Sequence, residues 1–245
     1  MNVEVYLTPL PFVKAQMDNK SVVVIDVLRS STSICAALAA GAKGVIPTDG
    51  PGEAGEMRMK IGAESTVLAG ERKGVKIDNF HLGNSPAEFT EQSVGGKFVI
   101  MTTTNGTGIF ERTHGTSPVL ACGLVNISQV AAKLATVDQD LIIVCSGREG
   151  GFSIEDTLCA GMLISLLRSR HDIDVRLNDA ASLARLLYQS NENNLTSAIA
   201  TGEHGRFLDS IGFGEDVITA GKVDSIPVLP VLKDGRLVRE ADVVA

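Results

Sequence analysis

The sequence predicts an α/β protein with a layered, largely parallel sheet, helices on both faces, a helical C-terminal third and a C-terminal hairpin. Short β-branched runs alternate with helical stretches through the first two thirds, which favours right-handed crossovers between parallel strands. Aromatic residues are 4% of the 245 residues and Trp is absent, so we expect a core of Val, Ile, Leu and Ala, as in sheets buried on both faces. Residues 1–245 predict one domain, or two fused lobes with a boundary near residue 150.

Strands are predicted wherever a short apolar and β-branched run is bounded by turn-forming residues. These runs are residues 3–7, 22–27, 44–47, 66–69, 97–101, 118–121 and 140–145. Near the C-terminus, residues 226–232 and 237–238 flank Lys233-Asp234-Gly235-Arg236. Because Asp-Gly suits a type I′ turn, this segment predicts a β-hairpin.

Helices are predicted between the strands and throughout the segment after residue 154. The first group is residues 31–41, 52–61, 85–92, 106–112 and 126–136, and the second is 154–169, 178–189, 196–200 and 202–211. Leu183, Leu186 and Leu187 have helical spacing. Asn178 and Ser190 are expected to begin and end their helix.

Composition argues against several classes of protein. A net charge of −7 and few aromatic residues argue against a nucleic-acid partner. No run approaches about 18 uninterrupted apolar residues and no signal-peptide pattern is present, so we expect neither membrane insertion nor export, and a cytoplasmic location. The cysteines Cys35, Cys122, Cys145 and Cys159 form no CxxC pair and are expected to be reduced and mostly buried.

Ligands of open parallel sheets bind beyond the carboxyl ends of the strands, so the loops after the strands are the places to search. In VVVIDVLRSSTS, residues 22–33, Asp26 ends a strand and could hold a metal ion or attack phosphorus. Arg29 could bind phosphate through its fork of N–H groups. The alternative is structural: Ser30 or Ser31 caps the helix, and Asp26 pairs with Arg29.

The second loop, LAGERKG at residues 68–74, places Glu71, Arg72 and Lys73 after a strand and leads to Asn84 and Ser85 in HLGNSP. Such a charged run is often only solvated surface. The third loop is VIMTTTNGTG, residues 99–108. It could form a cradle of N–H and hydroxyl groups for an oxyanion, or be an ordinary strand edge.

The fourth loop, in residues 142–161, contains Ser146-Gly147-Arg148, whose glycine permits close approach of the backbone to a ligand. Ser153 is a predicted N-cap, and Asp156 three residues later would complete an acidic capping box. Because Glu155 is not needed for capping, it is the better candidate metal ligand.

Together the loops predict a hard-cation site and an anionic substrate. Carboxylates without a His or Cys cluster favour Mg²⁺ or Mn²⁺ over zinc, and the surplus of Arg and Lys implies a small, multiply anionic phosphate ester. The predicted metal ligands are Asp26, Glu71, Glu155 and Asp156, and the predicted catalytic residues are Asp26, Arg29, Arg72 and Glu155. The predicted substrate-binding residues are Asn84, Ser85, Thr103, Thr104, Asn105, Gly106, Thr107, Ser146 and Arg148.

The runs IDVLRSSTS, LAGERKG, LGNSP, TTTNGT and GFSIEDTLCAG resemble the 2-phosphosulfolactate phosphatase (ComB) family in content, order and spacing, over roughly residues 3–240. The resemblance implies that family's α/β fold and Mg²⁺-dependent hydrolysis of 2-phospho-3-sulfolactate to sulfolactate and phosphate, a step of coenzyme M biosynthesis. The chain departs from the family pattern at Asn79, at His81, where Asp is usual, and at Gly108, where Arg is usual.

Our mechanistic hypothesis is that Asp26 and Glu155 hold Mg²⁺ with help from Glu71 or Asp156, and that Arg29 with the turn at 104–107 neutralises charge. Attack by water and attack by Asp26 itself both remain open, and His81 is one candidate to protonate the leaving alkoxide. The alternatives are a phosphatase for another small phosphorylated hydroxy acid and a non-catalytic anion-binding protein of the same fold. A homodimer is expected only as a general prior.

Overall fold

The computed structural model describes residues 1–9, 17–113 and 118–240. Its strands are β1 (Asn2–Tyr6), β2 (Lys20–Ile25), β3 (Gly44–Pro47), β4 (Thr66–Arg72), β5 (Val75–Lys76), β6 (Phe98–Thr102), β7 (Val119–Cys122), β8 (Asp140–Cys145), β9 (Arg176–Leu177), β10 (Leu229–Lys233) and β11 (Arg236–Glu240). They form one 11-stranded sheet in the order β5-β4-β6-β3-β11-β10-β7-β2-β8-β1-β9. Strands β4, β6 and β3 are mutually parallel, and so are β7, β2, β8, β1 and β9. The α/β fold class is therefore confirmed.

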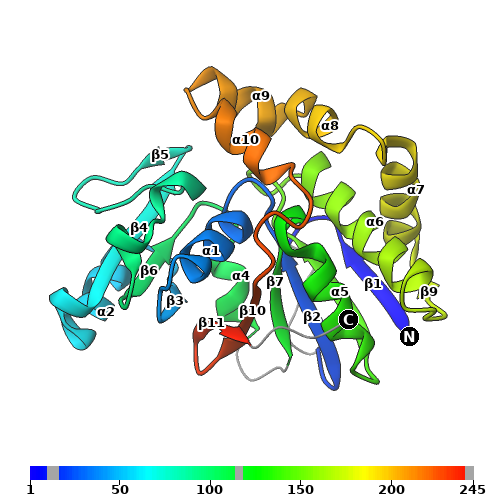
Figure 1. Ribbon diagram of the computed structural model, residues 1–245, viewed down its shortest axis with the longest axis horizontal. Coiled ribbons are helices and arrows are strands. Elements are labelled where there is room, and N and C mark those ends of the chain that lie inside the picture. Colours follow the sequence, from blue (N-terminus) through cyan, green and yellow to red (C-terminus); the bar gives the residue numbers. More distant parts are fainter. Residues whose placement is uncertain (10–16, 114–117, 241–245) are drawn as a thin grey trace.

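Helices cover both faces of this sheet and one end of it (Figure 1). They are α1 (Ser30–Ala39), α2 (Pro51–Ile61), α3 (Glu91–Val94), α4 (Thr107–Arg112), α5 (Ile127–Ala135), α6 (Ile154–Ser169), α7 (Asp179–Asn191), α8 (Leu195–Thr201), α9 (Glu203–Ser210) and α10 (Gly214–Ala220), with short 3-10 turns at Ala63–Ser65, Pro86–Glu88 and Leu124–Asn126. In Figure 1, α8, α9 and α10 lie together above the ends of the central strands.

Strand β2 shows why the sheet needs helices on both sides. Its alternate residues point to opposite faces, and all of residues 21–25 are buried. Val22 and Val24 pack in one cluster with Ile34 of α1, while Val23 and Ile25 pack in another with residues of α5 and α6. The predicted aliphatic core is thus observed, and all four cysteines are free and buried as expected.

The C-terminal hairpin forms as predicted. Lys233 and Arg236 are paired across the turn, and Asp234 and Gly235 have φ of 49° and 75°, the positive values that a type I′ turn requires. The hairpin is inserted into the middle of the sheet, where β11 pairs with β3 and β10 pairs with β7, both antiparallel.

One predicted helix is wrong. Residues 85–92 form the 3-10 turn Pro86–Glu88 and the short α3, because Phe89 and Thr90 have extended ψ values of 90° and 161°. Thr90 instead caps α3 by accepting the N–H of Ser93. Strands β5 and β9 and helix α10 were not predicted. Helix α7 does begin after Asn178, which caps it through the N–H of Ala181. No helix in the described part of the chain is long and apolar enough to cross a membrane.

Candidate active site

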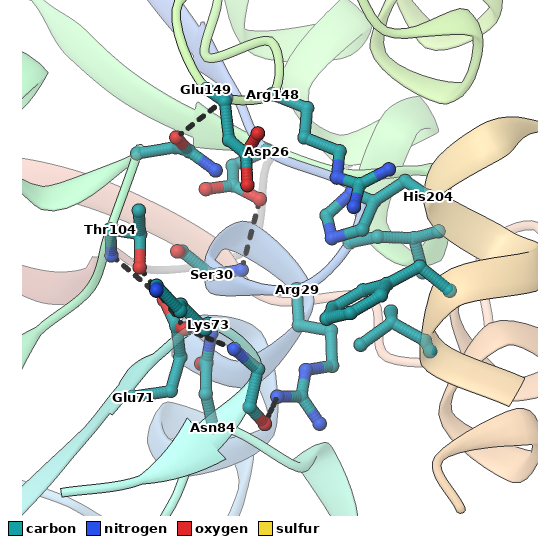
Figure 2. A pocket seen from close by; sticks show the side chains of 15 residues that line it. Asp26, Arg29, Ser30, Glu71, Lys73, Asn84, Thr104, Arg148, Glu149 and His204 are labelled. Carbon is teal, nitrogen blue, oxygen red and sulfur yellow. Dashed lines mark hydrogen bonds between the residues drawn. The ribbon is translucent and has the colours of Figure 1, made fainter. Parts of the chain in front are cut away.

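A pocket lies beyond the carboxyl ends of β2, β4, β6 and β8, and helix α9 closes its outer side. All four loops singled out in the sequence contribute to it, through Asp26, Glu71, Thr104 and Arg148 among others. From α9 come His204, Phe207 and Leu208. Figure 2 shows the labelled side chains gathered around one hollow, with His204 reaching in from the helical side. The expected convergence of the loops is therefore present in the structure.

Asp26 lies at the base of the pocket, where β2 ends and α1 begins. It is 3% exposed, and its Oδ1 accepts the N–H of Ser30 at 3.2 Å. Burial raises the pKa of Asp26 above its usual value, while Ser30 and the charge of His204 act in the opposite direction. A buried carboxylate at a helix start can bind a cation or act as a nucleophile, since the helix end favours its negative form.

Arg29 also lines the pocket, but its guanidinium is held by protein groups. Its Nη1 donates to Asp216 Oδ2 at 2.7 Å and its Nη2 to the Gly74 carbonyl at 2.7 Å. The same group stacks over Phe213 at 4.3 Å. Arg29 thus pairs with Asp216 of α10 rather than with Asp26, and two of its nitrogen atoms are occupied. These contacts, which we call the Arg29 clamp, hold the start of α1 against α10 and the β4–β5 turn. They leave Arg29 less able to bind phosphate through its fork of N–H groups.

Glu71 fastens the second loop to the third. Its carboxylate accepts the N–H of Thr104 at 2.7 Å, the hydroxyl of Thr104 at 3.1 Å and the N–H of Gly74 at 2.7 Å. These donors use both oxygens, so Glu71 holds the second and third loops together in this structure. The metal-ligand role of Glu71 stays a prediction.

Arg72 points away from the pocket, because neighbouring residues of a strand face opposite sides. Its guanidinium donates to Thr102 Oγ1 at 3.1 Å and to the Asp49 carbonyl at 3.2 Å, and it is absent from the pocket lining. The sequence-based choice of Arg72 as catalytic therefore does not match its position. Lys73 does line the pocket. It lies at the tip of the β4–β5 hairpin with φ of 52°, and among the described residues no carboxylate pairs with its ammonium group.

The third loop does not form the expected cradle. The N–H groups of Gly106 and Thr107 both donate to Thr103 Oγ1 at 3.2 Å, which leaves them unavailable to a ligand. Thr107 Oγ1 is likewise directed to the Thr48 carbonyl. Only Thr104 and Asn105 of this turn line the pocket.

Asn84 and Ser85 have different environments although they are adjacent. Asn84 is 4% exposed, lines the pocket, and its Oδ1 has no hydrogen-bond partner in the described structure. A buried amide oxygen without a partner is costly, so this oxygen is suited to accept a hydrogen bond from a ligand hydroxyl or a bound water. Ser85 instead donates to Asp216 Oδ1 at 2.6 Å, so it supports the Arg29 clamp.

The fourth loop contains a structural acid that was predicted as a metal ligand or capping residue. Asp156 accepts the N–H of Val27 at 2.8 Å, the N–H of Gly147 at 3.0 Å and the hydroxyl of Ser146 at 3.1 Å. Ser153 precedes the helix but makes no capping hydrogen bond, so the predicted capping box is wrong. Burial and the nearby charges of Glu155 and Asp26 raise the pKa of Asp156 well above its usual value. Asp156 and Ser146 thus join the ends of β2 and β8.

Arg148 reaches the pocket from the same loop. Its Nη1 donates to Glu203 Oε1 at 2.9 Å, and its guanidinium lies over the ring of Phe207 at 4.7 Å. Glu203 is largely exposed, with a side-chain exposure of 84%. An exposed ion pair of this kind is weak, so Arg148 is free to exchange Glu203 for a bound anion.

His204 is the functional candidate that sequence reasoning missed. Its Nδ1 lies 2.9 Å from Glu155 Oε1. The Glu155 side chain is 2% exposed, and its Oε2 has no partner in the described structure. His204 lies outside the four strand-end loops and belongs to no recognisable sequence motif, so no feature of the sequence points to it. His81, which was considered, lies outside the pocket lining and accepts the N–H of Leu68 at 3.0 Å through its Nδ1.

An α/β protein whose strand-end pocket combines a buried carboxylate, a carboxylate-paired histidine and several cationic side chains has the composition of a hydrolase for small anionic esters. A family model described as 2-phosphosulpholactate phosphatase matches residues 6–235. Proteins named "Probable 2-phosphosulfolactate phosphatase" are 39% identical in Caldanaerobacter subterraneus, over 89% of this chain and 90% of the relative, and 36% identical in Symbiobacterium thermophilum, over 91% and 95%. A third, from Clostridium beijerinckii, is 33% identical over 98% of this chain and 100% of the relative. The chain belongs to the 2-phosphosulfolactate phosphatase family, and with it to the phosphoric monoester hydrolases.

Proposed function

We propose that this protein hydrolyses 2-phospho-3-sulfolactate to sulfolactate and phosphate with Mg²⁺ as cofactor. The observation that carries the proposal is the pocket itself, which Lys73 and Arg148 line together with the buried carboxylate Asp26 (Figure 2). A substrate with a phosphate, a sulfonate and a carboxylate needs more than one cationic contact, and family membership names the same substrate class. We also propose a role in coenzyme M biosynthesis, a cytoplasmic location and a homodimer, each of which needs its own test.

The donors in the pocket fit Mg²⁺ only in part. Among the described residues, no group of three or more His, Cys, Asp or Glu side chains is arranged to hold a metal ion. Glu71 and Asp156 use their oxygens for N–H and O–H donors, and Glu155 pairs with His204. Mg²⁺ is commonly held by one or two carboxylates together with substrate phosphate and water. Asp26 is the residue that would hold it in this way.

The chain's own residues bind and orient the ester. Lys73 and Arg148 would attract the anionic groups, and the Asn84 amide would contact a polar group of the substrate. Arg29, held by Asp216, contributes fixed positive charge at the wall of the pocket. When bound beside Asp26, Mg²⁺ would polarise a phosphate oxygen and offset its charge. Attack by water and attack by Asp26 remain the two routes to the P–O cleavage.

The departures at His81 and Gly108 do not touch this pocket. Neither residue lines it, and a Cβ at Gly108 would approach Asp49 Oδ1 at 3.0 Å rather than any pocket residue. We therefore retain the substrate class that the family implies. Another phosphorylated hydroxy acid is the alternative, and the experiment below compares the two.

The test is phosphate release by the purified protein from phosphosulfolactate and from phospholactate, which lacks the sulfonate, with Mg²⁺ and with a chelator. We expect Mg²⁺-dependent release and a higher kcat/KM for phosphosulfolactate. Lys73→Ala should lower that preference about tenfold, the loss of one charged contact, whereas Lys76→Ala on the neighbouring strand β5, outside the pocket lining, should leave it unchanged. No phosphate release from either ester would refute the proposed function.

A further inference from the structure

The pair formed by Glu155 and His204 is not explained by substrate binding or by the fold. Glu155 is at the start of α6 and His204 is on α9, and they meet at the edge of the pocket at 2.9 Å. A buried carboxylate normally has all its oxygens hydrogen-bonded, yet Glu155 has the histidine on one oxygen and no partner on the other in the described structure. Because Nδ1 is used by Glu155, Nε2 is the ring nitrogen that remains for the pocket.

We propose that His204 is the catalytic acid that protonates the leaving alkoxide, and that Glu155 is the residue that positions it. This inference rests on the proposed function, because it concerns the same pocket and the same reaction. A carboxylate on one ring nitrogen fixes the tautomer and orientation of an imidazole and stabilises its protonated form. The pair here has that arrangement, with the carboxylate excluded from water and the ring facing the substrate side.

The reaction requires such a group. When the ester P–O bond breaks, its electron pair goes to the alkoxide oxygen of a hydroxy acid, which is a poor leaving group. His204 Nε2 transfers a proton to that oxygen as the bond breaks, and the alcohol leaves neutral. Water supplies the new oxygen on phosphorus, and the proton that this water releases restores His204. General acid catalysis of this kind contributes about 10²- to 10⁴-fold to a rate.

The surroundings of His204 are mixed in charge. Glu155 of α6 contacts the ring, and Asp26 of β2's end interacts with it electrostatically. Arg148 and Glu149 of the loop after β8 line the same two hollows as His204, and Glu203 is its neighbour on α9. Other candidates for the acid are less well placed, since His81 lies outside the pocket lining.

Esters with different leaving groups show whether His204 is an acid catalyst or only a structural contact between α6 and α9. Phospholactate releases an alkoxide that needs a proton, whereas p-nitrophenyl phosphate releases a phenolate that does not. We expect His204→Gln to lower kcat on phospholactate about 10²- to 10⁴-fold and on p-nitrophenyl phosphate less than tenfold. Glu155→Gln should show the same selectivity with smaller losses. His171→Gln, a partly exposed histidine outside the pocket lining, is the matched control and should behave as the wild type.

Equal losses on the two esters in His204→Gln would overturn the inference and leave the proposed function intact. Failure of the wild type to release phosphate from any ester, phosphosulfolactate included, would overturn the proposed function and the inference together.

Discussion

Replacing Gly106 with Ala should damage the site without straining the backbone. Gly106 has φ of −82° and ψ of −39°, values that any L-residue adopts. An added Cβ would nevertheless lie 2.9 Å from Ser30 Oγ and 3.1 Å from Ser30 Cβ, and closer still to Asp26 Oδ2. Comfortable contacts of this kind are about 3.5 Å or more, so the loop or the Asp26 carboxylate must move by about 1 Å.

Such a displacement has a calculable cost. A misplacement of about 1 Å in a catalytic group costs roughly 100-fold in rate, so we expect kcat/KM of Gly106→Ala to fall about 100-fold. Crowding of a packed site should also lower the free energy of unfolding by about 1–3 kcal/mol. Both are measured on one preparation, by phosphate release and by urea unfolding.

The control is Gly52→Ala on helix α2, where an added Cβ meets nothing within 4 Å. Its activity should equal that of the wild type, and its stability should be unchanged or slightly increased, because Ala is the better helix former. A Gly106→Ala variant with kcat/KM within threefold of the wild type would show that the approach of Gly106 to Asp26 does not constrain the catalytic carboxylate.

Two further predictions concern stability. Asp216→Ala leaves the buried guanidinium of Arg29 without its 2.7 Å partner, so the free energy of unfolding should fall by about 3–5 kcal/mol; a loss below 1 kcal/mol in urea unfolding would contradict the clamp. Burial and the charges of Asp49 and Glu53 raise the pKa of Glu111 from 4.5 to about 7, so the folded state keeps a proton that the unfolded state loses first. The free energy of unfolding should therefore fall as pH rises from about 4.5 to about 7, by about 1 kcal/mol after allowance for solvent screening. Glu111→Gln should remove that fall, which unfolding curves at pH 4.5 and pH 8 measure. An identical pH dependence in the variant and the wild type would refute the raised pKa of Glu111.

The sheet was predictable because its strands carry their own signal. The run at β2 is apolar on both faces, as expected of a strand between two helical layers. The Asp234-Gly235 pair indicates a type I′ turn and therefore a hairpin. The helix predicted over residues 85–92 failed for a local reason. The Thr90 N–H donates to Ser93 Oγ, and the Ser93 N–H donates to Thr90 Oγ1. This pair of hydrogen bonds begins the new helix α3 where the sequence pattern predicted one continuous helix.

The location of the site was predictable and the roles within it were not. Carboxyl ends of parallel strands meet at one edge, so the convergence of Asp26, Glu71 and Arg148 follows from topology. The partner of each side chain depends on tertiary contacts. Arg29 finds Asp216 at a separation of 187 residues, and Glu155 finds His204 on a helix that follows no strand of the site. A loop-by-loop search cannot identify such pairs.

The C-terminal hairpin has a consequence for how the pocket comes into being. Strand β2 and its parallel neighbours carry Asp26 and Arg148, strands β4 and β6 carry Glu71 and Thr104, and β10 and β11 separate the two sets. During synthesis every other strand emerges before this hairpin. The two sets of strands are therefore complete before β10 and β11 are available to join them into one sheet. A ribosome stalled ahead of residue 229 would display every pocket residue supplied by the strand-end loops, yet those loops would have no continuous sheet to hold them in register.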